Sequence, residues 1–403
     1  MSYFGCSTAS MKRLLTIALI LLPFLSNAQD HRALHRQAIV IDTHNDVLST
    51  VSMRGKKLDS DLSGQTHSDV SRLLRGGVDV QVFAIFCDER FGKDTAFKYA
   101  NIEIDSLYEI VRRNPARMMM VSTPAQLMRA VVSGKLGCMM GVEGGHMIED
   151  NPAYLDSLYK RGVRYMTLTW NNSTSWASSA KDETSHTVPN PASGLNELGR
   201  QIVRRMNALG MMVDLSHTGE RTFWDAIATT TKPVIVSHSC VYSLCPHRRN
   251  LKDDQISAIG RNGGVIHMNF NAGFIDSTFD AKMALLSARH KGEIDSLAAL
   301  KWTDYEIEDR LVAKYKGEVD AIRPPLSMLL DHIDYVVKLI GVDHVGIGSD
   351  FDGSIIPPLG LDDVTALPNL TRGLMQRGYS AKDIRKILGG NFLRVFAANQ
   401  PGK

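Results

Sequence analysis

The feature that most constrains this chain is a series of eight short apolar runs, rich in β-branched residues, that recur along its 403 residues. The runs are Ala38–Thr43, Val78–Phe86, Gly137–Val142, Val163–Thr169, Met211–Leu215, Pro233–Ser237, Gly264–Asn269 and His344–Ser349. Near-continuous apolar runs of this length are typical of strands that are buried on both faces of a parallel sheet.

Helix-like stretches lie between these runs. Leu195–Leu209 has apolar residues at helical spacing and closes on Gly210, a favourable C-cap, and Asp253–Ile259 and Leu326–Ile340 follow the same pattern. Eight strands that alternate with helices predict an α/β fold of the (β/α)8 TIM-barrel type. No internal repeat or low-complexity linker interrupts the pattern, so residues 29–403 are expected to form a single barrel domain.

One connection is too long for a simple crossover. Residues 271–325, rich in Lys, Glu and Asp, separate the seventh and eighth runs. They are expected to form an inserted helical pair on the rim of the barrel.

The N-terminus has the three parts of a signal peptide. Lys12 and Arg13 precede an apolar run from Leu14 to Leu25, and the small residues Ser26-Asn27-Ala28 follow. The run is much shorter than the roughly 20 residues that span a bilayer, which disfavours a transmembrane helix. Residues 1–28 are therefore predicted to be a signal peptide, with Met11 as a candidate true start, and the mature chain to be periplasmic or secreted without an integral membrane segment.

Charge and cysteine content exclude other classes. The formal net charge is +3 and no basic tract carries interleaved aromatic residues, which argues against nucleic acid as a partner. No CxxC motif occurs, so thiolate zinc is not expected. Whether Cys240 and Cys245 pair as a disulfide is left open by the sequence.

Metal-competent side chains gather at the ends of the predicted strands. The carboxyl ends of the strands of a barrel build its active site. Five such residues follow the first, third, fifth and sixth runs, namely His44, Asp46, Glu143, His217 and His238. Because strand side chains alternate, His44 and Asp46 point the same way and can reach one ion. Imidazole and carboxylate ligands suit Zn²⁺.

The same positions predict a two-metal site. His217 and His238 come from adjacent strands and can hold a second ion, while Glu143 lies between the two groups and can bridge both. Such a pair can hold a hydroxide at neutral pH and polarise a carbonyl. Asp350, after the eighth run, is then placed to act as the general acid and base.

Arg249 is the candidate for substrate recognition. It lies in Pro246-His247-Arg248-Arg249-Asn250, closely after His238. An arginine fork can take a carboxylate with two hydrogen bonds, although a solvated loop arginine fits the same sequence.

Together these motifs resemble the membrane dipeptidases, also called renal dipeptidases. The resemblance runs in order from about residue 37 to 397 and rests on six short motifs and a C-terminal signature. They are His44-Asn45-Asp46, Gly141-Val142-Glu143-Gly144-Gly145, Asp214-Leu215-Ser216-His217, Ser237-His238-Ser239, Arg248-Arg249-Asn250, Gly348-Ser349-Asp350-Phe351-Asp352-Gly353 and Gly389-Gly390-Asn391-Phe392-Leu393-Arg394-Val395-Phe396.

The resemblance implies an amidohydrolase-like barrel with two Zn²⁺ that hydrolyses dipeptides, often with a D-residue at the C-terminal position, and that forms homodimers. It implies that His44 and Asp46 bind one ion, that His217 and His238 bind the other, and that Glu143 bridges them. It also implies Asp350 as the acid/base and Arg249 as the grip on the substrate carboxylate.

One position departs from the family pattern. Animal members have a histidine after the fourth strand that contacts the substrate near the scissile carbonyl, whereas this chain has Trp170. Tryptophan cannot become cationic there, so oxyanion stabilisation is expected to fall on the metals or on Asn171 or Asn172. The alternative function is another metal-dependent amidohydrolase reaction, on N-acyl amino acids, lactams or lactones. A non-catalytic barrel is disfavoured, because no ligand position is missing.

Overall fold

The structure is a computed structural model that describes residues 1–5, 30–185 and 194–402. Most of the predicted signal peptide, residues 6–28, lies outside the described residues. None of the described helices is both long and apolar enough to cross a membrane.

All the strands of the sheet are parallel and eight of them close into a ring. The strands are β1 (Ile41–Asp42), β2 (Val80–Ile85), β3 (Met118–Met120), β4 (Leu136–Val142), β5 (Val163–Thr167), β6 (Met212–Asp214), β7 (Ile235–Ser239), β8 (Val265–Met268) and β9 (Val345–Ile347). The order is β2-β1-β9-β8-β7-β6-β5-β4, and β2 pairs with β4 to close the barrel. The predicted (β/α)8 barrel is confirmed.

The short strand β3 was not predicted. It pairs with the beginning of β4, from Leu136 to Cys138, whereas β5 pairs with β4 only from Met140 onward. A ninth strand thus extends the sheet at the start of β4, outside the closed ring.

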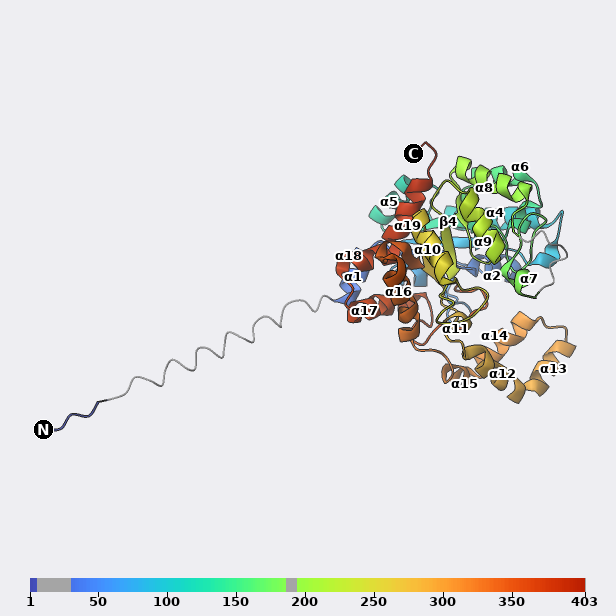
Figure 1. The fold of residues 1–403 in the computed structure, drawn as a ribbon. Helices are drawn as coiled ribbons and strands as arrows, with labels where there is room; N and C mark the ends of the chain where they lie inside the picture. Colours follow the sequence, from blue (N-terminus) through green and yellow to red (C-terminus); the bar gives the residue numbers. More distant parts are fainter. Residues whose placement is uncertain (6–29, 186–193, 403) are drawn as a thin grey trace.

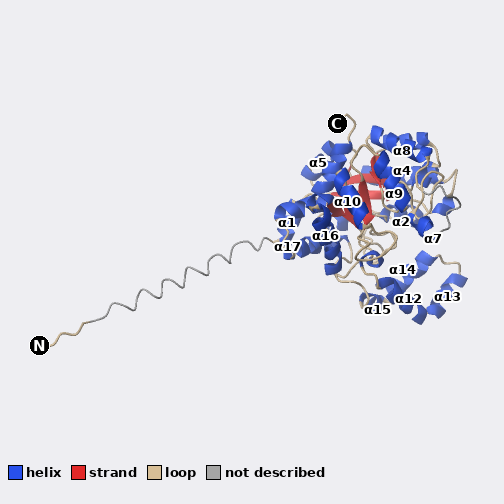
Figure 2. Ribbon diagram, viewed as in Figure 1, coloured by secondary structure: helices blue, strands red, loops and turns tan. Residues whose placement is uncertain are grey.

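Helices surround the barrel, and Figures 1 and 2 show the strands enclosed by them. The helices outside the long insertion are α1 (His31–Gln37), α2 (Val47–Arg54), α3 (Val70–Arg75), α4 (Ala96–Arg113), α5 (Pro124–Val132), α6 (Pro152–Lys160), α7 (Ala180–Ser185), α8 (Glu197–Leu209), α9 (Glu220–Thr229), α10 (Asp253–Asn262), α16 (Leu326–Ile340), α17 (Leu367–Gln376), α18 (Ala381–Arg385) and α19 (Asn391–Asn399). Gly210 caps α8 in a left-handed conformation, as its position predicted.

The insertion between β8 and β9 contains five helices and not the expected pair. They are α11 (Ala272–Ile275), α12 (Phe279–Arg289), α13 (Lys291–Ala299), α14 (Asp304–Lys314) and α15 (Lys316–Asp320). Figure 1 shows α12–α15 gathered at one side of the molecule, next to the ring of barrel helices. Phe279, Leu286 and Val319 form a small apolar core of their own with Ala272 and Ile356, which explains how the segment packs apart from the main core.

The inside of the barrel is filled by a separate apolar cluster, to which β1, β2 and β4–β8 contribute and which includes Tyr165. Phe392 and Phe396 of α19 belong to the same cluster, so the C-terminal helix packs against the barrel interior. Asn391 anchors this helix by donating hydrogen bonds to the carbonyl oxygens of Val342 and Val345, at 2.7 and 2.8 Å. The functional side chains then occupy the opposite end, where the strands end.

Candidate metal centre

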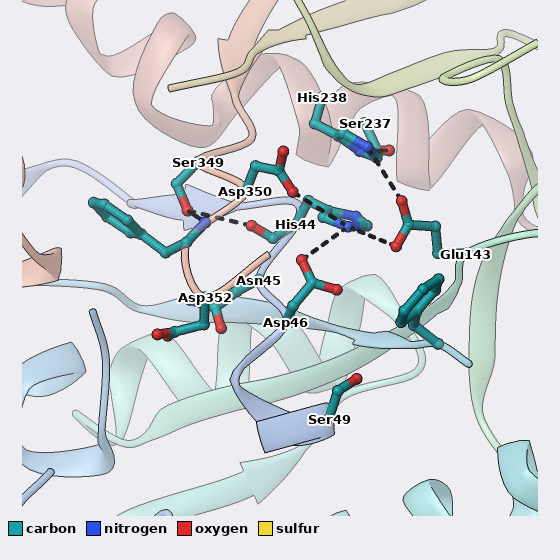
Figure 3. A network of polar contacts seen from close by, with 12 residues as sticks. His44, Asn45, Asp46, Ser49, Glu143, Ser237, His238, Ser349, Asp350 and Asp352 are labelled. Atoms are coloured by element: carbon teal, nitrogen blue, oxygen red, sulfur yellow. Dashed lines mark hydrogen bonds and ion pairs between the residues drawn. The ribbon is translucent and has the colours of Figure 1, made fainter. Parts of the chain in front are cut away.

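The six polar side chains predicted at the strand ends lie together at the carboxyl face of the barrel. His44 and Asp46 follow β1, Glu143 follows β4 and His217 follows β6. His238 lies in β7, and Asp350 follows β9. Figure 3 shows His44 at the centre of this group, with Asp46, Glu143 and Asp350 around its ring and His238 beside it, the two ring centroids 3.8 Å apart.

One half of the centre is built around His44. Its Nε2 lies 3.4 Å from Asp46 Oδ2, 3.4 Å from Glu143 Oε2 and 3.9 Å from Asp350 Oδ1. This nitrogen is buried and forms no hydrogen bond. A buried nitrogen surrounded by three carboxylates and without a hydrogen bond is a place where a cation is strongly favoured.

The other half is built around two imidazoles. His217 Nε2 and His238 Nε2 lie 3.1 Å apart, and they lie 2.9 and 3.4 Å from Glu143 Oε1. The two oxygens of Glu143 therefore face different halves, Oε2 toward His44 and Oε1 toward His217 and His238.

These separations fit a divalent ion. Ligand atoms about 2.1 Å from a tetrahedral Zn²⁺ lie about 3.4 Å from one another, and the distances within each half cluster around that value. Ligand-capable atoms of His44, Glu143 and His238 lie within 4.8 Å of one another, as do those of His44, Asp46 and Asp350. The donor set, nitrogens and carboxylate oxygens with no thiolate, suits zinc and its neighbours in the first transition row.

The ring orientation of His44 is set from the far side of its imidazole. Tyr165 Oη donates to the carbonyl oxygen of Thr43 at 2.9 Å, and it lies 2.9 Å from His44 Nδ1. Since the phenol has one proton, its oxygen accepts from His44 Nδ1–H. With its proton on Nδ1, the neutral imidazole of His44 has its lone pair on Nε2, the nitrogen that faces the carboxylates.

His238 and His217 are oriented in a similar way. Ser237 Oγ donates to Asp214 Oδ2 at 2.6 Å and accepts from His238 Nδ1–H at 2.8 Å. His217 Nδ1 lies 3.3 Å from Asn171 Oδ1, an acceptor. Nδ1 of each of the three imidazoles thus has an acceptor, and Nε2 of each faces Glu143, which is the arrangement that metal-binding histidines require.

The pKa values follow from burial and from these neighbours. Burial, followed by the charge of Arg249, lowers the pKa of His217 to about 3. Burial opposes ionisation of Glu143, but the three imidazoles around it hold its pKa well below the usual range. Burial, with the charges of Asp46 and Glu143, raises the pKa of Asp350 well above the usual range. The centre thus combines an ionised carboxylate with a second carboxyl group that can hold a proton.

Asp350 is held in an unusual backbone conformation. Its φ is 63° and that of His217 is 61°, a left-handed region that residues other than glycine seldom adopt. Asn269, at the end of β8, donates to Asp350 Oδ2 at 2.8 Å, which leaves Oδ1 directed at His44. Strain of this kind is often found at functional sites.

The two adjacent arginines differ in environment. Arg248 is exposed, whereas Arg249 is buried, and within the described residues its guanidinium donates hydrogen bonds to Ser239 Oγ at 3.4 Å and to the carbonyl oxygen of His238 at 3.2 Å. Among the described residues, Arg249 Nε has no hydrogen-bond partner and no carboxylate forms an ion pair with this guanidinium. Burial lowers the pKa of Arg249 to about 10, so the group stays cationic at neutral pH. A buried cation without a counter-ion is suited to bind an anionic ligand.

Trp170 lies at the edge of the centre, beside His217. Its ring centroid is 6.4 Å from that of His217 and 4.9 Å from that of Phe86. Of the two candidate oxyanion donors, Asn171 directs Oδ1 toward His217, and Asn172 has a buried Oδ1 without a partner.

Cys240 and Cys245 are free thiols in this structure. Their Sγ atoms donate to different carbonyl oxygens, those of Asn269 and Gly273. The pairing that the sequence left open is therefore not present here.

Several residues that support the centre were missed by sequence reasoning. Asp42 accepts from the backbone nitrogen and Oγ of Ser349 at 2.8 and 2.6 Å, which ties the end of β9 to β1. Asp214 does the same for Ser237 across β6 and β7. Tyr165 and Asn269 were missed as well. The sequence did contain a signal for the two aspartates. Asp42 lies two residues before the candidate ligand His44, and Asp214 lies three residues before the candidate ligand His217.

Known proteins resemble this chain over nearly its whole length. The family model described as "Membrane dipeptidase (Peptidase family M19)" matches residues 28–401. Dipeptidase 3 of Macaca fascicularis is 30% identical over 369 residues, which cover 91% of this chain and 66% of that protein, somewhat less than two thirds of its length.

Solved structures share the fold. The probable dipeptidase PvdM of Pseudomonas aeruginosa superposes with a TM-score of 0.75 at 28% identity, covering 92% of this chain and 98% of that one. A metallo peptidase of Rhodobacter sphaeroides, liganded with a phosphinate mimic of the dipeptide L-Ala-D-Ala, gives a TM-score of 0.72 at 24% identity, covering 90% of this chain and 99% of that one.

Proposed function

This chain belongs to the membrane dipeptidase family, peptidase family M19. We propose that it is a metal-dependent hydrolase that uses two Zn²⁺ to cleave the peptide bond of dipeptides. The observation that carries the proposal is the pair of ligand clusters that share Glu143, each with separations close to those around a tetrahedral ion.

In this proposal His44 and Asp46 would hold one ion, His217 and His238 would hold the other, and Glu143 would be shared by the two. Zinc bound there would supply Lewis acidity to the scissile carbonyl and would lower the pKa of a bound water. The orientation of the three imidazoles, each with an acceptor at Nδ1, supports this assignment.

Asp350 is proposed as the acid and base. Its Oδ1 takes a proton from the attacking water and gives it to the nitrogen of the leaving amine, while Asn269 holds Oδ2. The pKa of Asp350, raised mainly by burial, is consistent with a carboxyl group that can hold a proton.

Arg249 is proposed to bind the free carboxylate of the substrate. Its buried and incompletely hydrogen-bonded guanidinium supports this role, and the exposed Arg248 has no comparable environment. A guanidinium that binds this carboxylate would limit the length of the product on the carboxyl side of the scissile bond.

Tolerance of a D-residue at the C-terminal position is a further part of the proposal. It follows from the family resemblance, and the substrate mimic bound to the Rhodobacter sphaeroides protein makes L-Ala-D-Ala a natural test compound. Trp170 beside His217, where animal members have histidine, is expected to change the preferred side chains.

The mature protein is proposed to be exported after cleavage of residues 1–28 and to act as a homodimer. N-terminal sequencing of the protein from its native host should find a start at or near Gln29. Light scattering on the purified mature chain should give twice the mass of one protomer, and a monomer mass would contradict the dimer.

The function is tested with a substrate panel on zinc-loaded protein. Free dipeptides, including L-Ala-L-Ala and L-Ala-D-Ala, are compared with N-acyl amino acids, lactams, lactones and tripeptides. We expect dipeptides to be cleaved with the highest kcat/KM. Faster hydrolysis of N-acyl amino acids or of a cyclic substrate would replace the dipeptidase proposal with the other amidohydrolase reactions.

A further inference from the structure

Tyr165 reaches the metal centre from inside the barrel. It lies in β5 among the apolar side chains of the barrel interior, and it is fully buried. Its hydroxyl nevertheless meets two atoms at the end of β1, the carbonyl oxygen of Thr43 and Nδ1 of His44, each at 2.9 Å. One side chain therefore connects β5 with β1, strands that are not neighbours in the sheet.

The direction of these two hydrogen bonds is determined by chemistry. A carbonyl oxygen only accepts, so the phenol proton goes to Thr43 and the phenol oxygen is left to accept from His44 Nδ1–H. In the neutral imidazole a proton on Nδ1 places the lone pair on Nε2, and among the described residues Nε2 faces Asp46 and Glu143 without a hydrogen bond.

The ring of Tyr165 can occupy this position because β4 has a glycine, Gly141, where the ring passes. A Cβ at Gly141 would lie 2.0 Å from Cζ of Tyr165 and 2.3 Å from both Cε atoms, far inside van der Waals contact. Gly141 has an ordinary negative φ, so its requirement for glycine is the close approach of this ring. The ring thus lies against the β4 backbone, which limits its movement.

We propose that Tyr165 is a positioning residue for His44, which fixes the tautomer and the ring plane of this ligand from across the barrel. The proposal rests on the proposed function, because it takes His44 as a metal ligand. It goes beyond that function by assigning a role to a tyrosine that itself offers no atom to the ions and that the sequence motifs do not include.

The test removes only the phenol oxygen. Tyr165→Phe keeps the ring that packs on Gly141 and leaves His44 Nδ1 without its acceptor. In stepwise Zn²⁺ titrations of the metal-stripped full chain against a chromophoric chelator, we expect one binding step to weaken about 10–100-fold, the range for loss of such a partner. The other step should change less than about twofold.

A second readout reports on His44 directly. In the native chain the Nδ1–H proton of His44 should give a downfield nuclear magnetic resonance signal that exchanges slowly with solvent, assigned with a His44→Gln variant. In Tyr165→Phe this signal should exchange rapidly or disappear. A residue that only supported packing would not change it.

Tyr154→Phe is the matched control, because Tyr154 is a half-buried tyrosine that stacks on Phe97 at 3.7 Å, away from the centre. It should leave both binding steps and the His44 signal unchanged. If Tyr165→Phe behaves like this control in both readouts, the positioning role is wrong. If the native chain binds no zinc, the proposed function fails, and the exchange of the His44 Nδ1–H signal still decides the role of Tyr165.

Discussion

The two halves of the metal centre receive negative charge from different places. Around His44 the carboxylates of Asp46, Glu143 and Asp350 face the ligand nitrogen directly, and the hydrogen bond behind the ring ends at a neutral carbonyl oxygen. Around His217 and His238, Glu143 is the one carboxylate of the described residues that faces the nitrogens, and the hydrogen bond behind His238 passes through Ser237 to the carboxylate of Asp214.

The two halves thus illustrate two ways in which a carboxylate can strengthen metal binding. A carboxylate in direct contact with the ion supplies full charge, whereas a carboxylate behind an imidazole makes that imidazole a better donor. Arg249 lies on the second side, where it donates to the carbonyl oxygen of His238. If Arg249 binds the substrate carboxylate as proposed, the anionic end of the substrate would lie beside the half with fewer carboxylates. The predictions below test this division, in order of decreasing effect.

The largest effect is expected where the two halves meet. Glu143→Gln replaces the one carboxylate that faces both sites by a neutral amide of the same shape. Loss of several kcal/mol of metal binding and transition-state stabilisation should lower kcat/KM for dipeptides about 10³-fold or more. Elemental analysis should show weakened retention of both ions. Loss of only one ion would mean that Glu143 belongs to a single half.

Arg249→Ala should have the next largest effect. A lost charge-assisted hydrogen bond to the substrate carboxylate corresponds to about 2–3 kcal/mol, or roughly a 30- to 150-fold fall in kcat/KM. Metal content should not change. Arg248→Ala, at the exposed neighbour, is the control and should be close to native. Dipeptide amides should be poor substrates of the native enzyme, and native-like rates with them would contradict the carboxylate grip.

Ser237→Ala should weaken one half selectively. It removes the hydroxyl between His238 Nδ1 and Asp214, so affinity for one ion should fall about 10–100-fold while the other ion stays bound. Because this relay ends at a charged group, the loss should exceed that in Tyr165→Phe when both variants are titrated side by side. Equal losses would show that the charge behind His238 contributes little.

The smallest effect concerns pH and α2, the helix that begins directly after Asp46. Glu103 lies behind α2, where it accepts from Ser49 and Ser52 and from the backbone nitrogen of Phe86, and burial raises its pKa to about 8. Below its raised pKa this carboxyl group is protonated in the native state. The stability that it confers is fully present below about pH 4.5 and is lost as pH rises to about 8.

Glu103→Gln should remove this pH dependence. The amide stays neutral, so the variant should melt a few degrees higher than the native chain at pH 8 and about the same at pH 4.5. Thermal unfolding of metal-free protein at several pH values measures the difference. A variant that loses stability in parallel with the native chain between those pH values would show that Glu103 does not titrate in this range.

Much of the fold could be predicted from the sequence, because buried parallel strands leave a strong apolar signal. Each of the eight runs overlaps a strand of the closed ring, and Leu326–Ile340 corresponds to α16 residue for residue. The strand Met118–Met120 was missed because it is short, contains no β-branched residue and pairs only with the beginning of β4. The helices of the insertion were underestimated because their short amphipathic stretches give a weak periodic signal.

The side chains that face the centre were accessible to sequence reasoning for a geometric reason. The ends of barrel strands converge, so His44, Glu143 and Asp350 were expected to approach one another, and they do. The groups behind them were not accessible, because Tyr165 lies inside a run that simply indicates a buried strand. The contact between Tyr165 and His44 depends on the width of the barrel and on the space at Gly141. Neither of these can be read from a local sequence pattern.

The close approach of Tyr165 to Gly141 also limits how this enzyme can be recombined with its relatives. A chimera that took β4 from a parent with a side chain at position 141, and β5 from this chain, would force that side chain into the tyrosine ring. A breakpoint between Val142 and Val163 would then damage the barrel even if each parent folds well. Breakpoints that keep β4 and β5 together carry the glycine and the tyrosine as one inherited unit, and libraries built that way should yield more folded members.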